Sequence, residues 1–515
     1  MSAWRRRLAQ EPDRTPWVPL SASPSSNGEF LPLSGTAMER VIDRAALARA
    51  ATAADRLGMD RRRFLQTTGG LAAVLATFNL AACASDRRSA GSSTSSTTPG
   101  GTFTVPDPED TVACDQALTS SGELIFDIHT HHVVPDGPWR QNAQRIAEMI
   151  RGLVPAGCVD ADPYRCIDRT AYLHDMFLAS DTTIALLSDV PNSGPLDAPV
   201  PWEAKRETRE LAAALAGDGG ARVLLHDVIA PNFGDLSMRL DEMERTAATG
   251  EVAAFKVYTA WGPEGRGFSL ADPAIGLPVV AKARSLGVRV ICAHKGLPLL
   301  EFDRSHNGPD DVVAVARQFP DMDFVIYHGA YEIQTTEGPY DPARAATGVN
   351  SLVKALDDHR IAPNGNVYAE LGTTWRETLS NPTEAAHMLG KLLSHVGEDN
   401  VLWGTDAVWY GSPQPQIAAF RAFEISPELQ DRHGYAALTP ELKAKVFGLN
   451  AARLFDVDPE AVRCGLDPAG LATARAELAA LHREGAVDPW HPRGPLTRRD
   501  ILTWARGLHE PWTPA

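Results

Sequence analysis

Residues 124–132 read LIFDIHTHH, an apolar run that leads directly into two histidines two positions apart. Side chains alternate along a strand, so His129 and His131 point to one side and His132 to the other. The first two histidines could therefore bind one metal ion together. A histidine pair alone is weak evidence, because such pairs also occur in tags and surface loops, so the rest of the chain must supply the context.

Apolar runs of this kind recur through the 515-residue chain from Leu124 onward, with amphipathic segments between them. The expected strands are 124–128, 183–187, 222–229, 252–258, 288–293, 323–327, 367–370 and 401–404. Continuous apolar runs separated by helical patterns indicate a parallel sheet that is buried on both faces. Eight such units predict an α/β fold of the (β/α)8 TIM barrel type, and a doubly wound open sheet is the alternative.

Ionisable residues close six of the eight expected strands, at the end where a barrel carries its chemistry. They are His129 and His131, Lys256, His294 with Lys295, His328, Glu370 and Asp406. Each alone has an ordinary explanation, such as a packed histidine, a snorkelling lysine or a helix-capping aspartate. Buried together, they are costly unless they are paired or bind a cation, and imidazoles with a carboxylate suit zinc or a similar divalent ion.

The order of these residues resembles the metal-dependent amidohydrolase superfamily, in which HxH, Lys, His, His and Asp follow strands one, four, five, six and eight. Residues 402–406, LWGTD, and 446–455, VFGLNAARLF, look like its amidohydrolase-related (amidohydrolase 2) branch. The resemblance covers about residues 124–456. It implies a metal-dependent hydrolase.

The same resemblance implies a ligand set for one divalent metal ion, with Zn²⁺ favoured: His129, His131, His294 and Asp406. His328 would then orient or deprotonate the water, or bind a second metal. Lys256 separates one metal from two, because in some branches a lysine here is carboxylated and bridges a metal pair. In other branches it contacts substrate or structure, and we favour one ion.

These parts predict hydrolysis of an ester, lactone or amide-type C–O or C–N bond by a metal-activated water. Asp406 would accept the proton and pass it to the leaving group, and His328 or Lys295 would stabilise the oxyanion. One alternative is a decarboxylase or hydratase of an aromatic or unsaturated carboxylic acid, since the same branch contains such enzymes. The other is a non-catalytic surface lipoprotein, against which stands the presence of every expected ligand.

Aromatic residues follow several strand ends and suit a flat or apolar substrate. The substrate-binding candidates are Tyr258, Trp261, Tyr331, Glu370, Trp375 and Trp409, with Tyr410 beside them. The aromatic members could equally pack the loops together. Arg266 and Arg376 are candidates to receive a substrate carboxylate.

The N-terminal region contains three signals in the order that an export leader requires. Residues 60–66, DRRRFLQ, resemble the twin-arginine motif, with Asp60 where Ser or Thr is usual. The apolar stretch 69–82 is too short to span a membrane as a helix, and LAAC at 80–83 looks like a bacterial lipobox with lipid on Cys83. We expect twin-arginine export and an extracytoplasmic protein anchored to the membrane. A short buried helix is the alternative, and a start at Met59 is left open.

We expect four regions in the chain. They are a signal region with lipobox at 1–83, a Ser/Thr/Gly-rich linker at 84–117, the barrel at 118–460 and a helical C-terminal extension at 461–515. The formal net charge of −16 makes nucleic acid a poor partner. The expected partners are a small-molecule substrate and, through Cys83, a membrane, and a homodimer is left open. Cys158 and Cys166 could close a local disulfide, whereas Cys292 has the setting of a packed core thiol.

Overall fold

The chain is described by a computed structural model in which most of the barrel and its flanking helices are placed. The described residues are 18–22, 36–89, 99–119, 122–152, 162–214, 222–297, 302–333 and 335–465, with short helical pieces between 470 and 480.

Eight parallel strands form the centre of the molecule in the order of the chain. They are β2 (Phe126–Thr130), β3 (Ile184–Leu187), β4 (Val223–Ile229), β5 (Val252–Val257), β6 (Val290–His294), β7 (Asp323–Tyr327), β8 (Val367–Glu370) and β9 (Val401–Leu402). The Ile128 amide donates to the Trp403 carbonyl at 3.1 Å, and Thr130 forms a parallel bridge with Ala407, so the chain after β9 returns to β2. The predicted (β/α)8 TIM barrel is confirmed.

Alternation along each strand divides its residues between the barrel interior and the helical layer outside. On β6, Val290 and Cys292 lie in the inner apolar cluster, and Ile291 and Ala293 lie in the outer one. Cys292 is a buried free thiol, as predicted. The same alternation directs His294 inward.

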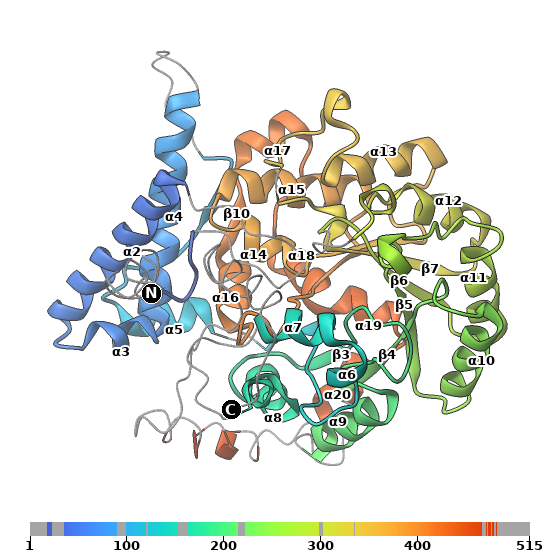
Figure 1. Ribbon diagram of the computed structural model, residues 1–515. Helices are drawn as coiled ribbons and strands as arrows, with labels where there is room; N and C mark the ends of the chain where they lie inside the picture. The colour runs from blue at the N-terminus through green and yellow to red at the C-terminus, as the bar shows by residue number, and fades with distance from the viewer. Residues whose placement is uncertain are drawn as a thin grey trace, which may run out of the picture.

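Helices surround the strands (Figure 1). The main ones are α9 (Trp202–Ala214), α10 (Leu236–Ala247), α11 (Gly276–Ser285), α12 (Asp310–Gln318), α13 (Val349–His359), α15 (Pro382–His395), α16 (Gln414–Ala422) and α19 (Asn450–Leu454). Short helices lie in the connections between strands, among them α8 (Arg169–Leu173) before β3 and α14 (Thr374–Thr378) after β8.

A further helical layer lies beside the barrel, drawn in blue and cyan at the left of Figure 1. It contains α2 (Ala37–Arg56), α3 (Arg61–Leu65), α4 (Thr68–Ser89) and α5 (Thr111–Leu118), with strand β1 (Gly101–Phe103) paired antiparallel to β10 (Phe423–Ile425). The residues expected to form a signal and a linker therefore include α3, α4, β1 and α5. Export, cleavage and lipidation stay predictions, and no helix among the described residues is long and apolar enough to cross a membrane.

The C-terminal part of the chain is described only in part. Helix α20 (Pro459–Gly465) begins the predicted helical extension, and most of residues 461–515 lie outside the described residues. Cys166 is disulfide-bonded, whereas Cys158, its predicted partner, lies outside the described residues.

A buried ion pair fixes the loop that follows β7. The Lys391 ammonium on α15 contacts the Glu337 carboxylate and donates to Asn350 Oδ1 at 2.9 Å. Glu337 also accepts from the Val349 amide at 3.0 Å, at the start of α13. The pair thereby ties the loop between β7 and α13 to α15.

We predict that Lys391→Met lowers the free energy of unfolding by about 3–5 kcal/mol, because it leaves the Glu337 carboxylate buried without its cation. Chemical denaturation measures the change. Lys354→Met is the matched control, since its pair with Asp358 is about half exposed, and it should change stability by less than about 0.5 kcal/mol. Equal effects of the two variants would contradict the prediction.

Candidate metal centre

Two histidines and one aspartate meet at the carboxyl end of the barrel. His129 and His131 come from the end of β2, and Asp406 follows β9. Asp406 Oδ1 lies 3.5 Å from His129 Nε2 and 3.3 Å from His131 Nε2, and all three side chains are buried. His132 is turned away and contacts Thr208 Oγ1 at 2.9 Å. The three ligand-type atoms are close enough together to hold one metal ion.

The spacing of these atoms fits a tetrahedral divalent ion. Zinc bonds of about 2.1 Å place neighbouring ligand atoms about 3.4 Å apart, close to the two distances from Asp406. Burial, followed by the nearby Lys256 charge, holds the pKa of His129 well below its usual value. The imidazole is therefore neutral, which is the protonation state that a metal ligand needs.

His294 and His328 form a second pair beside this cluster. His294 Nε2 lies 2.6 Å from the Leu297 carbonyl, and His328 Nδ1 lies 2.8 Å from the Gly372 carbonyl. A carbonyl only accepts, so we assign the ring protons to these two nitrogens. The remaining nitrogens, His294 Nδ1 and His328 Nε2, lie 3.2 Å apart and both carry lone pairs when the rings are neutral. A shared proton or a nearby cation would stabilise this arrangement.

Of the four predicted ligands, the structure brings three together, and the fourth, His294, lies beside them. The metal-competent groups among the described residues are His129, His131 and Asp406, and His129, His328 and Glu370. His294 belongs to neither group but contacts His328, with ring centroids 4.6 Å apart. Direct binding of the ion by His294 stays a prediction.

Glu370, predicted to bind substrate, lies behind the histidines at the end of β8. Its Oε2 accepts from His129 Nδ1 at 3.2 Å and from the His328 amide at 3.1 Å, and its Oε1 accepts from the Gly372 amide. Burial raises the pKa of Glu370 to about 7, although His328 opposes the shift. The carboxylate is placed to orient His129, in the way that outer carboxylates orient metal-binding histidines.

Two glycines make room for this carboxylate. A Cβ atom on Gly404 would lie 1.8 Å from Glu370 Oε1 and 3.0 Å from His129 Cβ. A Cβ atom on Gly372 would lie 2.4 Å from Glu370 Oε1 and 2.6 Å from His129 Nδ1. A larger side chain at either position would displace the Glu370 carboxylate and His129.

Lys256 extends inward from β5 to the same cluster. Its Nζ lies 3.1 Å from His129 Nε2, and it lies over the rings of Tyr327 and Tyr258 at 4.4 and 4.8 Å from their centroids. The lysine therefore lies where a carboxylated lysine would have to be to bridge two metal ions. Carboxylation of Lys256, with a second ion, stays the alternative to a contact with substrate or structure.

Lys295 is not brought to the cluster. Its Nζ pairs with Asp311 at 2.7 Å and donates to the His306 carbonyl at 3.0 Å. The physical reason is alternation: His294 points into the barrel, so the next residue points into the helical layer. The predicted role of Lys295 at an oxyanion therefore lacks support from its contacts.

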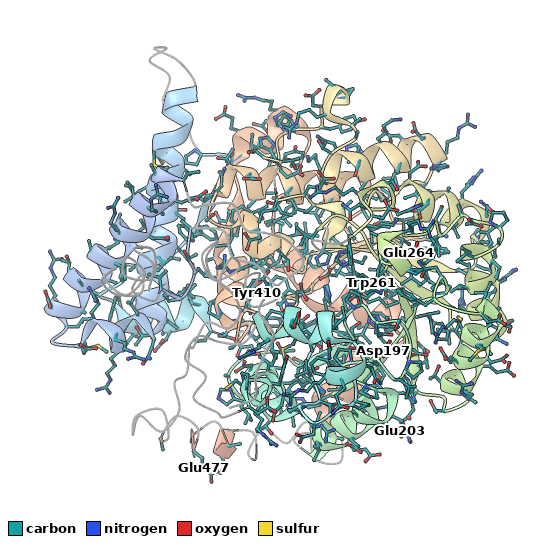
Figure 2. All side chains as sticks on the ribbon, in the orientation of Figure 1. Asp197, Glu203, Trp261, Glu264, Tyr410 and Glu477 are labelled. Carbon is teal, nitrogen blue, oxygen red and sulfur yellow. The ribbon has the colours of Figure 1, made fainter. Side chains whose placement is uncertain are left out.

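Aromatic rings cover part of the cluster. Trp409 stacks on His131, Tyr258 stacks on His294, and Phe302 meets His294 edge-on. Trp261 lies next to Phe302 and donates its indole N–H to the Asn192 carbonyl at 3.2 Å. Trp261 and Tyr410 are labelled in Figure 2, and they come from the segments that follow β5 and β9.

Other predicted substrate residues lie elsewhere or have other partners. Trp375 is fully buried in the outer core and donates to the Gln416 carbonyl, and Tyr331 packs with Leu297. Arg266 is exposed and pairs with Glu264 at 2.5 Å. Arg376 is buried, with its guanidinium 5.8 Å from the Tyr410 ring centroid, so of the two arginines it is the one inside the fold.

The structure adds polar residues that the sequence interpretation missed. Thr373 donates to Asp406 Oδ2 at 2.8 Å. Asp127 accepts from the amides of His129 and Thr405, each at 3.1 Å, and burial raises its pKa to about 8. The position of Asp127 two residues before His129 was an available signal, whereas nothing in the sequence marks Thr373.

Three residues of the site have left-handed backbone conformations. The φ angles are 62° at His328, 58° at Thr373 and 62° at Asp406. Non-glycine residues adopt this region rarely, and such strain gathers at functional sites. The three residues lie in the segments that follow β7, β8 and β9, where the sequence and the family place the chemistry of the barrel.

Comparison with known proteins gives a family match over most of the barrel. The family Amidohydro_2, described as amidohydrolase, matches residues 126–457. Comparison with curated proteins finds no match.

Several solved structures are similar to the chain. One is an uncharacterized TIM-barrel protein from Bordetella bronchiseptica, 14% identical, with 64% of this chain and 99% of that one covered and a TM-score of 0.41. Another is 5-carboxyvanillate decarboxylase from Sphingomonas paucimobilis, 17% identical, with 65% and 100% covered and a TM-score of 0.43. A third is 2,6-dihydroxybenzoate decarboxylase from Rhizobium, 14% identical, with 65% and 99% covered and a TM-score of 0.40.

We predict that Glu370→Gln weakens metal binding by roughly 10- to 100-fold. A glutamine has one oxygen and a donating amide, so it cannot accept all three N–H groups that the carboxylate accepts. Competition with a chromophoric chelator measures the affinity for Zn²⁺. Glu384→Gln is the matched control, because burial also raises the pKa of Glu384 to about 7 but the residue lies on α15, away from the histidines. Unchanged affinity in Glu370→Gln would contradict the orienting role.

Proposed function

The chain belongs to the amidohydrolase family Amidohydro_2, whose members are metal-dependent enzymes built on a TIM barrel, and from this we propose that it is a metal-dependent hydrolase. The proposed reaction is attack of an activated water on an ester, lactone or amide-type C–O or C–N bond. The observation that carries the proposal is the buried meeting point of His129, His131 and Asp406. A donor set of two imidazoles and a carboxylate is typical of catalytic zinc, which keeps a further position for water or substrate.

His129, His131 and Asp406 are the residues that would hold the ion, with His294 as the proposed fourth ligand. A divalent ion bound there supplies a water molecule whose pKa is lowered toward about 7 and polarises a substrate carbonyl. Zn²⁺ is the proposed ion, and one ion is proposed in preference to two.

Asp406 is the proposed proton acceptor. Its Oδ1 faces the histidines, while Thr373 donates to Oδ2 and holds the carboxylate in one orientation. A proton taken up by Asp406 could pass to the leaving group as the bond breaks. His328 is the proposed second proton-handling group, because its Nδ1–H is held by the Gly372 carbonyl and its Nε2 lies 3.2 Å from His294 Nδ1, with which it could share a proton.

The aromatic residues over the cluster support a flat or apolar substrate. Trp409, Tyr258, Phe302 and Trp261 form an apolar cover that would exclude water from the reacting atoms. Tyr410 lies 3.2 Å from Thr373 Oγ1 and close to Arg376. Arg376 is therefore the proposed contact for a substrate carboxylate.

We predict that Asp406→Asn reduces kcat at least about 100-fold, since the amide can neither accept the proton nor balance the charge of the ion. Steady-state kinetics at fixed, measured metal content provide the test. Thr373→Val is the comparison variant, because it keeps the carboxylate and removes only its hydrogen bond, so its loss of kcat should be smaller. A near-normal kcat in Asp406→Asn would remove Asp406 from the mechanism.

We also predict that purified protein binds about one equivalent of divalent metal, and that dialysis against a chelator abolishes turnover until Zn²⁺ or Mn²⁺ is restored. Panels of aryl esters, lactones and amides should be assayed beside aromatic carboxylic acids. Ester, lactone or amide cleavage supports the proposal. Release of carbon dioxide from the acids would replace it with a decarboxylase, and no turnover with no bound metal would replace it with a binding protein.

A further inference from the structure

The apolar stretch that resembles an export leader is built into the folded protein. Helix α4 contains residues 69–82, and Leu71 through Leu75 together with Phe78 are no more than 5% exposed. These side chains belong to the same apolar cluster as residues of the barrel helices, such as Leu389 and Leu392 of α15. We infer that α3 and α4 are permanent elements of the mature protein and that the chain is not cleaved before Cys83.

Polar contacts fix α4 to the strand that follows it. Asn79 donates to the Phe103 carbonyl at 2.8 Å and accepts from the Phe103 amide at 2.8 Å. The side chain of Asn79 thus satisfies both backbone groups of Phe103 on β1. A leader that is removed has no need of such a reciprocal pair.

The two glycines at the start of the stretch have a packing role as well. A Cβ atom on Gly69 would lie 2.6 Å from the Pro108 carbonyl oxygen, and one on Gly70 would lie 2.4 Å from that of Phe64. Both glycines therefore allow α4 to approach α3 and the segment before α5. The Gly-Gly pair is explained by this contact in the folded state.

Cleavage before Cys83 would cut α4 inside its length and uncover the residues beneath it. Phe103 is nearly fully buried, and its ring centroid lies 6.5 Å from that of Phe78 and 6.4 Å from that of Trp375. Trp375 lies two residues after Thr373, which holds Asp406. Loss of α4 would thus expose apolar surface beside the short helix α14 of the candidate metal centre.

The arginines of the same segment have a different setting. Arg61, Arg62 and Arg63 are exposed, and Asp60 caps the N-terminus of α3. The three arginines of the motif are therefore accessible on the folded protein, whereas the apolar stretch that follows them is buried. Retention and the predicted lipid on Cys83 exclude each other, since lipoprotein maturation makes Cys83 the first residue.

The first test is the intact mass of the full chain with a C-terminal tag, purified separately from the membrane and soluble fractions of a bacterial host that has twin-arginine export and lipoprotein processing. The inference expects every fraction to retain residues 61–82. A protein that begins at a lipid-modified Cys83 would overturn it, as would unmodified protein cut at that position.

The second test uses substitutions inside the stretch, because a change in a leader that is removed cannot alter the mature protein. Phe78→Ala should lower the midpoint of thermal unfolding of the purified protein by about 4 °C or more, since it leaves a cavity beside Phe103. Leu80→Ala is the matched control in the same helix, with Leu80 60% exposed, and should leave the midpoint unchanged. Identical midpoints for wild type and Phe78→Ala would overturn the inference. If Phe78→Ala does not fold, the intact mass of the wild-type protein tests the inference by showing whether residues 61–82 are retained.

Discussion

Burial of several ionisable side chains at one end of the barrel is the constraint on which the other features of the site depend. His129, His131 and Asp406 are withdrawn from water, and Lys256 contacts the same group. Charges and lone pairs in such a place are stable only when each has a partner. A divalent ion would satisfy the three ligand atoms at once, and the two distances from Asp406, 3.5 and 3.3 Å, are close to those between ligands of a tetrahedral ion.

The residues around the cluster supply hydrogen-bond partners for its buried polar groups. Glu370 accepts three N–H groups and thereby holds His129 and the backbone of His328, while Gly404 leaves space for its carboxylate. Thr373 holds Asp406 from the other side. Preorganised groups of this kind need little rearrangement during a reaction, which is how a buried polar site contributes to catalysis.

The N-terminal segment shows how one sequence pattern can satisfy two physical descriptions. A moderately apolar stretch with small residues suits an export leader and equally suits a helix packed between other elements. Asn79 and the glycines distinguish the two only through their contacts with Phe103 and with Pro108. Sequence periodicity cannot predict those contacts, because they join segments that are separate in the chain.

The amino-acid sequence by itself determined the barrel, since eight buried apolar runs alternate with helices, and it determined which strand ends carry histidine, lysine and carboxylate groups. Only the tertiary structure decided how these groups combine. It turned Lys295 outward, placed Glu370 behind the histidines and Trp375 in the outer core, and brought in Thr373. The physical reason is that the sequence sets the type and spacing of side chains along each strand, whereas alternation, left-handed turns at strand ends and packing between distant segments set their direction.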